Sequence, residues 1–141
     1  MSEHITAQNH LTHAGAKAIV AAAIAKATEL GVPINVAVAD TGSNLMAFER
    51  MDQAMIISGS IAIDKAWTVA AAGGLSTQQF YEVVAAEPEL KLSFPHRDRL
   101  VLFGGGVPVK INDELVGSVG VSGGSAAEDA EIATAGANAV A

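Results

Sequence analysis

The stretch that decides the fold is RLVLFGGGVPVKINDELVGSVGVSGGSAAEDAEIATAGA, residues 99–137. Its first apolar run, residues 100–103, has the length of a buried strand and is too short for a helix. The three glycines at 104–106 have no side chains, so they permit positive φ angles and a close approach of another backbone. Pro108 cannot donate a hydrogen bond to a neighbouring strand, so its strand is expected at the edge of a sheet.

A β-hairpin is predicted in the middle of this stretch. The polar residues 112–114 separate two apolar runs, as a hairpin turn does. The second run has glycine at positions 117 and 120, where packed side chains are expected. Another backbone or a ligand is therefore expected to lie close to this strand.

A helix N-terminus follows the hairpin and forms the first candidate binding site. Ser125 and Glu128 have the spacing of a capping box, which predicts that the final helix begins here with free backbone N–H groups. Gly123 and Gly124 precede the cap, so two glycine-rich corners and one helix N-terminus can meet at one end of the strands. Backbone donors and the helix dipole favour an anion there, although tight turns without a ligand explain the same glycines equally well. The Walker lysine pattern is missing, so nucleotide binding is not predicted.

Composition and charge narrow the function classes. A chain of 141 residues suits one domain with a single core. The net charge of −7 argues against a nucleic-acid surface, and no apolar run is long enough for a membrane span. The N-terminus lacks the pattern of a signal peptide, so a cytoplasmic protein is expected. The absence of cysteine excludes disulfides, thiolate metal sites and a cysteine nucleophile.

The N-terminal third is predicted to form a helix followed by a hairpin. The helix is expected over residues 11–30, with Thr12 as its cap and Gly31 as its stop. Strands are expected at residues 34–39 and 45–50, around a turn at 40–44.

The most unusual residue is Lys65, in a second helix predicted over residues 56–72. Lys65 is in register with Ile57 and Val69, on the stripe that should face the core. One interpretation is structural, with a snorkelling stem or a buried ion pair. The other is functional, with an amine that holds a carboxylate or acts as a base or nucleophile. The candidate partners for an ion pair are Asp52, Asp64 and Asp129.

A second capping box and a long loop complete the predicted fold. Ser76 and Gln79 predict a short helix that runs to Ala86. Residues 89–99 have no clean periodicity and are predicted to be a loop that covers a pocket. Together the elements predict an α+β fold, with one mainly antiparallel sheet of about five strands flanked by helices. The predicted loop carries aromatic, imidazole and guanidinium groups: Phe94, His96, Arg97 and Arg99.

Three sequence motifs occur in a fixed order along the chain: NVAVADTGSNLMAFERMDQA, then SIAIDKAW, then FGGGVPVKINDELVGSVGVSGGSAAEDAEIA. Together they resemble the GlcG/HbpS family of haem-binding and proposed haem-degrading proteins. The C-terminal domain of PduO-type cobalamin adenosyltransferases shows the same pattern. The resemblance implies a profilin- or PAS-like sheet in a single domain, residues 11–141, after a flexible N-terminus, residues 1–10.

The resemblance also implies a homo-oligomer larger than a dimer, encoded beside catabolic genes. Alanine-rich helices bury little area each, which likewise favours further burial between subunits. Some family members bind haem, but the residue that contacts iron differs among them. In this chain the imidazoles available to haem iron are His10, His13 and His96. His10 and His13 are three residues apart, so both can face one side of a helical turn.

Two function classes stay open. The first is a small-molecule-binding protein that holds haem or a related tetrapyrrole in an apolar pocket, with a histidine on the iron and cations on the propionates. The second is a cofactor-free isomerase, lyase or hydrolase that acts on a small carbonyl or carboxylate compound. Its acid/base groups would be Lys65 and His96, and Arg50 would clamp the carboxylate. Neither class implies a nucleic-acid or membrane partner. The candidate ligand-binding residues are Arg50, Lys65, Phe94, His96, Gly104, Gly105 and Gly106.

Overall fold

The structure is a computed structural model that describes residues 2–141, so the first residue of the predicted flexible N-terminus lies outside it. None of the helices in the described residues is long and apolar enough to cross a membrane. In chain order the elements are α1 (His13–Leu30), β1 (Asn35–Asp40), β2 (Leu45–Arg50), α2 (Ile57–Ala71), α3 (Thr77–Ala85), α4 (Pro88–Ser93), the 3₁₀ helix η1 (Phe94–His96), β3 (Gly106–Ile111), β4 (Glu114–Ser122) and α5 (Ala126–Asn138).

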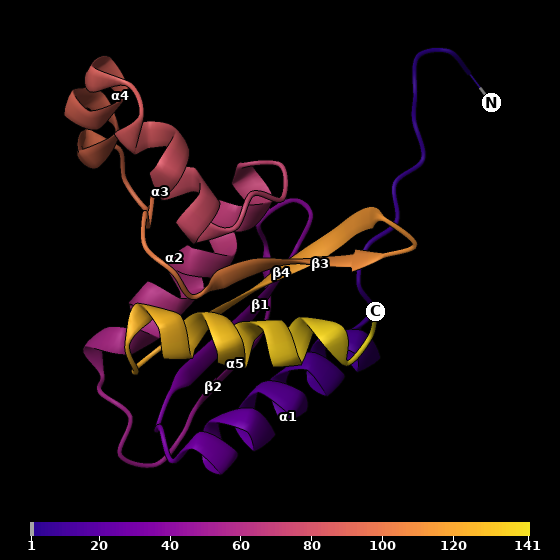
Figure 1. Cartoon of the computed structure of the whole chain (residues 1–141). Helices are drawn as coiled ribbons and strands as arrows, with labels where there is room; N and C mark the ends of the chain where they lie inside the picture. The colour runs from indigo at the N-terminus through magenta and orange to yellow at the C-terminus, as the bar shows by residue number, and fades with distance from the viewer. Residues whose placement is uncertain (1) are drawn as a thin grey trace.

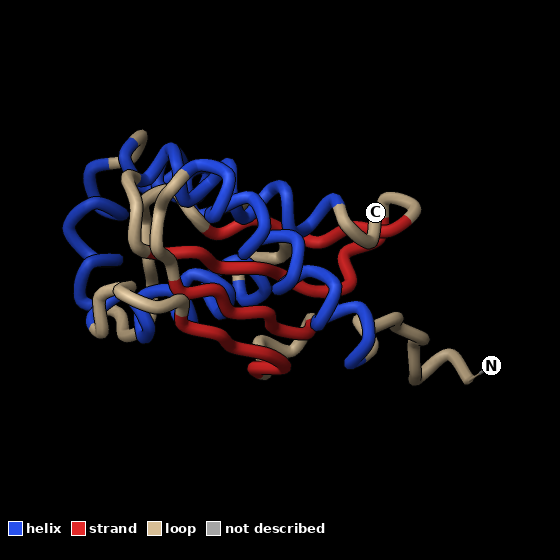
Figure 2. Tube along the Cα trace, turned by 90° about the horizontal axis from the view of Figure 1, so that it is seen from below, coloured by secondary structure: helices blue, strands red, loops and turns tan. Residues whose placement is uncertain are grey.

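The strands form one antiparallel sheet between two layers of helices. Their order is β2-β1-β4-β3, and each pair of neighbours is antiparallel. Helix α2 covers one face of the sheet, and α1 and α5 lie side by side on the other (Figure 1, Figure 2). Strand β3 is at an edge, as Pro108 predicts.

Alternating side-chain size decides how closely the two layers approach the sheet. On β1, Val36 and Val38 point into the core formed with α1 and α5, whereas Ala37 and Ala39 point toward α2. On β4, Gly120 lies directly against the backbone of α2, where a Cβ atom would collide with a carbonyl oxygen. The prediction that another backbone approaches this strand is therefore confirmed.

The predicted turns and caps are present. The Thr12 side chain accepts a hydrogen bond from Gly15 N, and Gly31 ends α1 with a φ of 71°. Both predicted capping boxes are formed, at the starts of α3 and α5. The turn between β3 and β4 has Asn112 and Asp113 at φ angles of 52° and 64°, the left-handed region that a tight hairpin requires.

The α+β fold with an antiparallel sheet is confirmed, but the number of strands and two predictions about residues 89–103 differ from the structure. The described residues form a sheet of four strands, not five, because residues 100–103 stay outside the sheet. The hydroxyl of Thr68 on α2 explains this: it accepts from Val101 N at 3.1 Å and donates to Arg99 O at 3.0 Å, so this segment bonds to a helix. Residues 89–99 are not simply a loop, because α4 and η1 occupy most of them. Pro88 at the first turn of α4 suits a helix start, since its missing N–H is not needed there.

Helices α3, α4 and η1 form an arm, residues 77–96, that projects from the sheet. Figure 1 shows it at the upper left, away from α1 and α5. Phe80 of α3 and Phe94 of η1 hold its two sides together, with ring centroids 5.6 Å apart in an edge-to-face arrangement.

Candidate functional site

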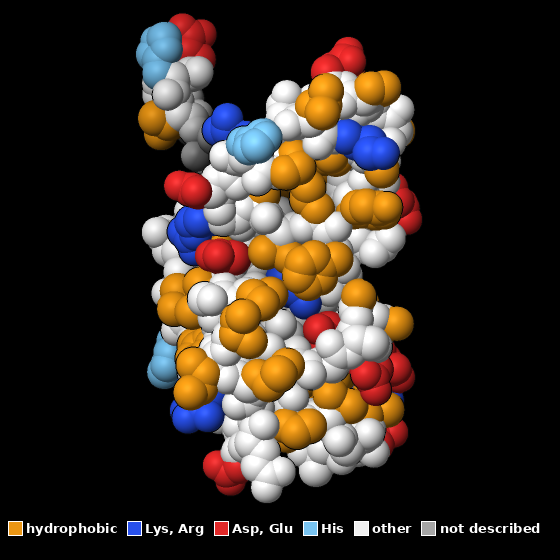
Figure 3. All heavy atoms as spheres, turned by 90° about the vertical axis from the view of Figure 1, so that its left-hand side faces the viewer, with side chains coloured by type: hydrophobic (Ala, Val, Ile, Leu, Met, Phe, Trp, Pro, Cys, Tyr) orange, Lys and Arg blue, Asp and Glu red, His pale blue; other side chains and the backbone are white. Residues whose placement is uncertain are grey.

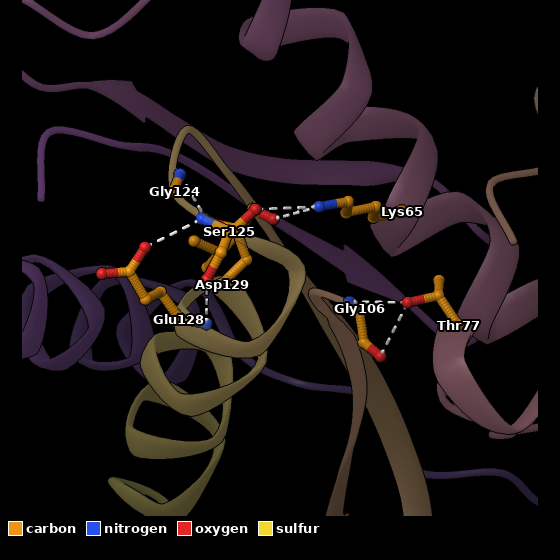
Figure 4. Close-up of polar contacts among 8 residues, drawn as sticks. Lys65, Thr77, Gly106, Gly124, Ser125, Glu128 and Asp129 are labelled. Carbon is orange, nitrogen blue, oxygen red and sulfur yellow. Dashed lines mark hydrogen bonds and ion pairs between the residues drawn. The ribbon is translucent and has the colours of Figure 1, made fainter. Parts of the chain in front are cut away.

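The most buried charged group in the described residues is the ammonium of Lys65, and it is paired inside the protein. Its Nζ donates to Asp129 Oδ2 at 3.2 Å and to the carbonyl oxygen of Val121 at 2.8 Å (Figure 4). The other carboxylate oxygen of Asp129 accepts from Gly124 N at 2.8 Å. The side chains of Lys65 and Asp129 are 0% and 4% exposed, respectively. Lys65 therefore forms the buried ion pair that the structural interpretation predicts, and its partner is Asp129.

The glycine corners make room for this pair. Gly105 has a φ of +129°, and a Cβ atom there would collide with Lys65 Nζ. Its carbonyl oxygen accepts from Val121 N at 2.8 Å, which fixes the corner to β4. The N–H of Gly106 donates to Thr77 Oγ1 at 3.0 Å, at the start of α3 (Figure 4). With these contacts the Lys65 side chain is enclosed by protein atoms, at 0% exposure.

Electrostatics explain why a carboxylate belongs at this corner. Burial lowers the pKa of Lys65 from its ordinary value, while the charge and the hydrogen bond of Asp129 act in the opposite direction. The ring of Phe103 lies over Nζ, 4.8 Å from its centroid, and adds a cation–π contact. The start of α5 and the glycine corners meet, as the sequence predicts. The anion at this helix N-terminus is the carboxylate of Asp129, a residue of the protein itself.

The other residues predicted for one ligand site lie on separate elements. Arg50 is exposed at the end of the edge strand β2, opposite Asn35. His96 is exposed in η1, and Phe94 packs against Phe80 inside the arm. Strand β2 is one edge of the sheet, whereas the chain returns from the arm into β3, the other edge. The structure does not bring Lys65, Arg50 and His96 to a common surface.

The two histidines near α1 border different hollows. His10 lines a hollow of about 460 Å³ with residues at the hairpin end of β3 and β4, and its Nδ1 lies 2.6 Å from Thr41 Oγ1. His13 lines a second hollow, of about 370 Å³, between α1 and β2. Within residues 2–141, His, Asp and Glu form no cluster of three that could hold a metal ion by itself.

The hollow between α1 and β2 contains residues that sequence reasoning missed. Lys17 lies one helical turn after His13, so both side chains project from one face of α1. The apolar wall comes from Val20 on the helix and from Met46 and Ala47 on the strand, and Glu49 lies in the same lining. The i, i+4 spacing of His13 and Lys17 is visible in the sequence, but the packing of β2 beside α1 is not.

Comparisons with known proteins agree over nearly the whole chain. The family described as haem degrading protein HbpS-like matches residues 11–138. A 15.0 kDa protein from the dhaT-dhaS intergenic region of Citrobacter freundii is 38% identical over 120 residues, 84% of this chain and 84% of that protein. Protein GlcG of Escherichia coli is 37% identical over 107 residues, 76% of this chain and 77% of GlcG.

Solved structures give the same result. Klebsiella pneumoniae protein ORFY superposes with a TM-score of 0.87 at 33% identity, covering 99% of this chain and 96% of ORFY. A double mutant of Streptomyces reticuli HbpS superposes with a TM-score of 0.86 at 28% identity, covering 100% of this chain and 94% of HbpS. PduOC, solved as a complex with heme, superposes with a TM-score of 0.83 at 30% identity, covering 93% of this chain and 95% of PduOC. The resemblance seen in the sequence motifs is confirmed, and the chain belongs to the HbpS-like family.

Proposed function

We propose that this protein binds haem or a closely related tetrapyrrole non-covalently. The observation that carries the proposal is the similarity to PduOC, which was solved with heme and is 30% identical over 93% of this chain. The sequence contains no cysteine, so thioether attachment of haem is not available. An imidazole is a common proximal ligand of haem iron, which makes the histidines beside the hollows the relevant groups.

The hollow beside His13 supports this proposal through its chemistry. The imidazole of His13 can face iron, and the ammonium of Lys17, one turn away, can pair with a propionate. The apolar side chains of Val20, Met46 and Ala47 suit the face of a macrocycle. A volume of about 370 Å³ is at the lower end for ligand pockets, so part of a macrocycle bound here would need a second surface to cover it.

A homo-oligomer larger than a dimer is part of the same proposal, since neighbouring copies supply further apolar surface. Met55, Ile56 and Ile57 are 57%, 83% and 68% exposed, at the start of α2. The start of α2 lies on the left of Figure 1, the side turned to the viewer in Figure 3, where hydrophobic side chains gather. Exposed apolar patches of this kind mark interaction surfaces on soluble proteins.

Titration with ferric haem tests the ligand and the residue together. The unmodified chain is expected to give a sharpened Soret band, and His13→Ala to bind about 10- to 100-fold more weakly, as when a group that supports a metal site is lost. His96→Ala, on the distant arm, is the matched control and should bind like the parent. If only His10→Ala weakens binding, the hollow beside His10 is the site. If all three variants bind like the parent, histidine ligation is wrong.

The oligomer is tested by native mass spectrometry at micromolar concentration. A species of at least three subunits is expected, and Ile56→Asp should shift it toward smaller species, because a charge would be buried in the interface. Leu92→Asp provides a control, since Leu92 is also highly exposed, at 75%, but lies on the arm. A monomer of 14.3 kDa for the unmodified chain would contradict the proposal.

A further inference from the structure

The two edges of the sheet differ in how they are protected against the addition of another strand. Edge strand β3 carries Pro108 and Lys110, and residues of both types discourage pairing at a sheet edge. The opposite edge strand, β2, contains neither proline nor lysine, and its residues 48–50 are exposed. In Figure 2 β2 is the lowest strand and borders open space on its outer side. A further strand can therefore be added at β2.

The hydrogen bonds of β2 show which backbone groups face this open side. Met51 N, which follows the strand, donates to Ile34 O at 3.0 Å, on the side of β1. Backbone groups alternate in direction along a strand, so those of Phe48 and Arg50 point away from β1. Within residues 2–141, β1 is the strand that pairs with β2, and no strand lies on its other side. The outward N–H and C=O groups are those that an added strand would bond.

A second copy of β2 fits this edge in one register. The regular part of the strand is residues 47–50, because the pairing with β1 shifts just before it. A two-fold axis makes the pairing antiparallel, with outward-facing residues opposite one another, so Phe48 meets Phe48, Phe48 meets Arg50, or Arg50 meets Arg50. The second register places Glu49 opposite Glu49 and the third places Arg50 opposite Arg50, so both bring like charges together. The first avoids this and joins the two Phe48 residues by a pair of backbone hydrogen bonds.

Charge complementarity between the copies favours the same register. Glu49 lies opposite Val36 of β1, so its side chain is on the face of the sheet that α1 covers. When Phe48 meets Phe48, Glu49 lies opposite Ala47 of the second copy. Ala47 and Lys17 line the same hollow, so Glu49 of one copy can approach Lys17 of the other. Among the described residues, neither of these two charged side chains belongs to an ion pair.

We propose that two copies of this chain pair through their β2 strands, antiparallel and centred on Phe48, so that their four-stranded sheets become continuous. This inference rests on the homo-oligomer proposed above and names one of its interfaces. The pairing also brings a second copy to the hollow between α1 and β2, where a bound macrocycle needs a further surface.

Two charge variants, measured separately and mixed, test whether Glu49 and Lys17 meet between copies. Glu49→Lys and Lys17→Glu each place like charges across the interface. Each variant alone should therefore raise the dissociation constant of the pair about tenfold or more, measured by native mass spectrometry over a dilution series. An equimolar mixture joins opposite charges at both contacts, so it should assemble nearly as well as the parent. Mixing cannot repair a repulsion within one chain, so its effect isolates the contact between copies.

Arg50→Pro tests the backbone hydrogen bonds of the same interface. Proline removes an N–H that points away from β1, so the fold should be kept while assembly is weakened by about tenfold. Arg50→Ala removes the same side chain but keeps the N–H, so this control should assemble like the parent. Circular dichroism of both variants checks that they are folded.

Either of two results would overturn the pairing through β2. The first is a mixture of the charge variants that assembles no better than each variant alone. The second is equal assembly of folded Arg50→Pro and Arg50→Ala. An oligomer of the unmodified chain would still stand in both cases, through another surface. A monomer of the unmodified chain would instead contradict the homo-oligomer as well, so the two failures are distinguishable.

Discussion

Asp129→Ala is expected to lower the free energy of unfolding by about 3–5 kcal/mol, because removing one partner of a buried ion pair leaves an uncompensated charge. Lys65 Nζ would keep only the carbonyl of Val121 at 2.8 Å and the ring of Phe103. Gly124 N would lose its acceptor in the same substitution. Urea denaturation of the variant and the parent measures the effect, which is a large part of the 5–15 kcal/mol typical of a domain.

A matched control lies on the same helix. Glu131 pairs with Lys26 at 3.6 Å, but the Lys26 side chain is partly exposed and that of Glu131 is largely exposed. Glu131→Ala should therefore lower the free energy of unfolding by only about 0–1 kcal/mol. The double variant Lys65→Met and Asp129→Leu removes both charges, and it should be close to the parent in stability. If Asp129→Ala lowers the free energy of unfolding no more than Glu131→Ala does, the buried ion pair does not hold α2 to α5.

Gly120→Ala is expected to destabilise the protein by about 3 kcal/mol, at the upper end of the range for overpacked sites. A Cβ atom at this position would lie 2.6 Å from Ala66 N and 2.9 Å from Lys65 Cβ, and would collide with the carbonyl oxygen of Ala62. These are mainly backbone atoms of α2, so the helix would have to move away from the sheet. Thermal unfolding followed by circular dichroism measures the loss.

Gly15→Ala is the matched control for this substitution. Its nearest neighbours would be side-chain atoms of Leu11 and Thr12 at 3.4 and 3.5 Å, which is ordinary contact. Alanine should raise stability there by about 0.5 kcal/mol, because glycine loses more backbone entropy in a helix. Similar effects of the two substitutions would mean that α2 does not pack closely on Gly120.

Local signals in the sequence predicted most of the helices and strands correctly. A cap is a contact between residues three positions apart, so Ser125 with Glu128 and Ser76 with Gln79 could be identified without any tertiary information. The hairpin turn at Asn112 and Asp113 depends in the same way on neighbours in the chain. The prediction failed for residues 100–103, because Val101 N, like the neighbouring Arg99 carbonyl, bonds to Thr68, more than thirty positions away.

The candidate sites show the same division. The sequence by itself determined that Lys65 lies on the buried stripe of α2 and that glycine corners meet the start of α5. It left three aspartates as candidate partners, since nothing local distinguishes Asp52, Asp64 and Asp129. Only the tertiary structure decided the pairing: α2 and α5 cover opposite faces of the sheet, and Gly105 leaves a gap through which the Lys65 side chain reaches Asp129. An isolated buried ammonium is too costly to keep charged, so packing of the layers, and not spacing along the chain, determines which carboxylate it meets.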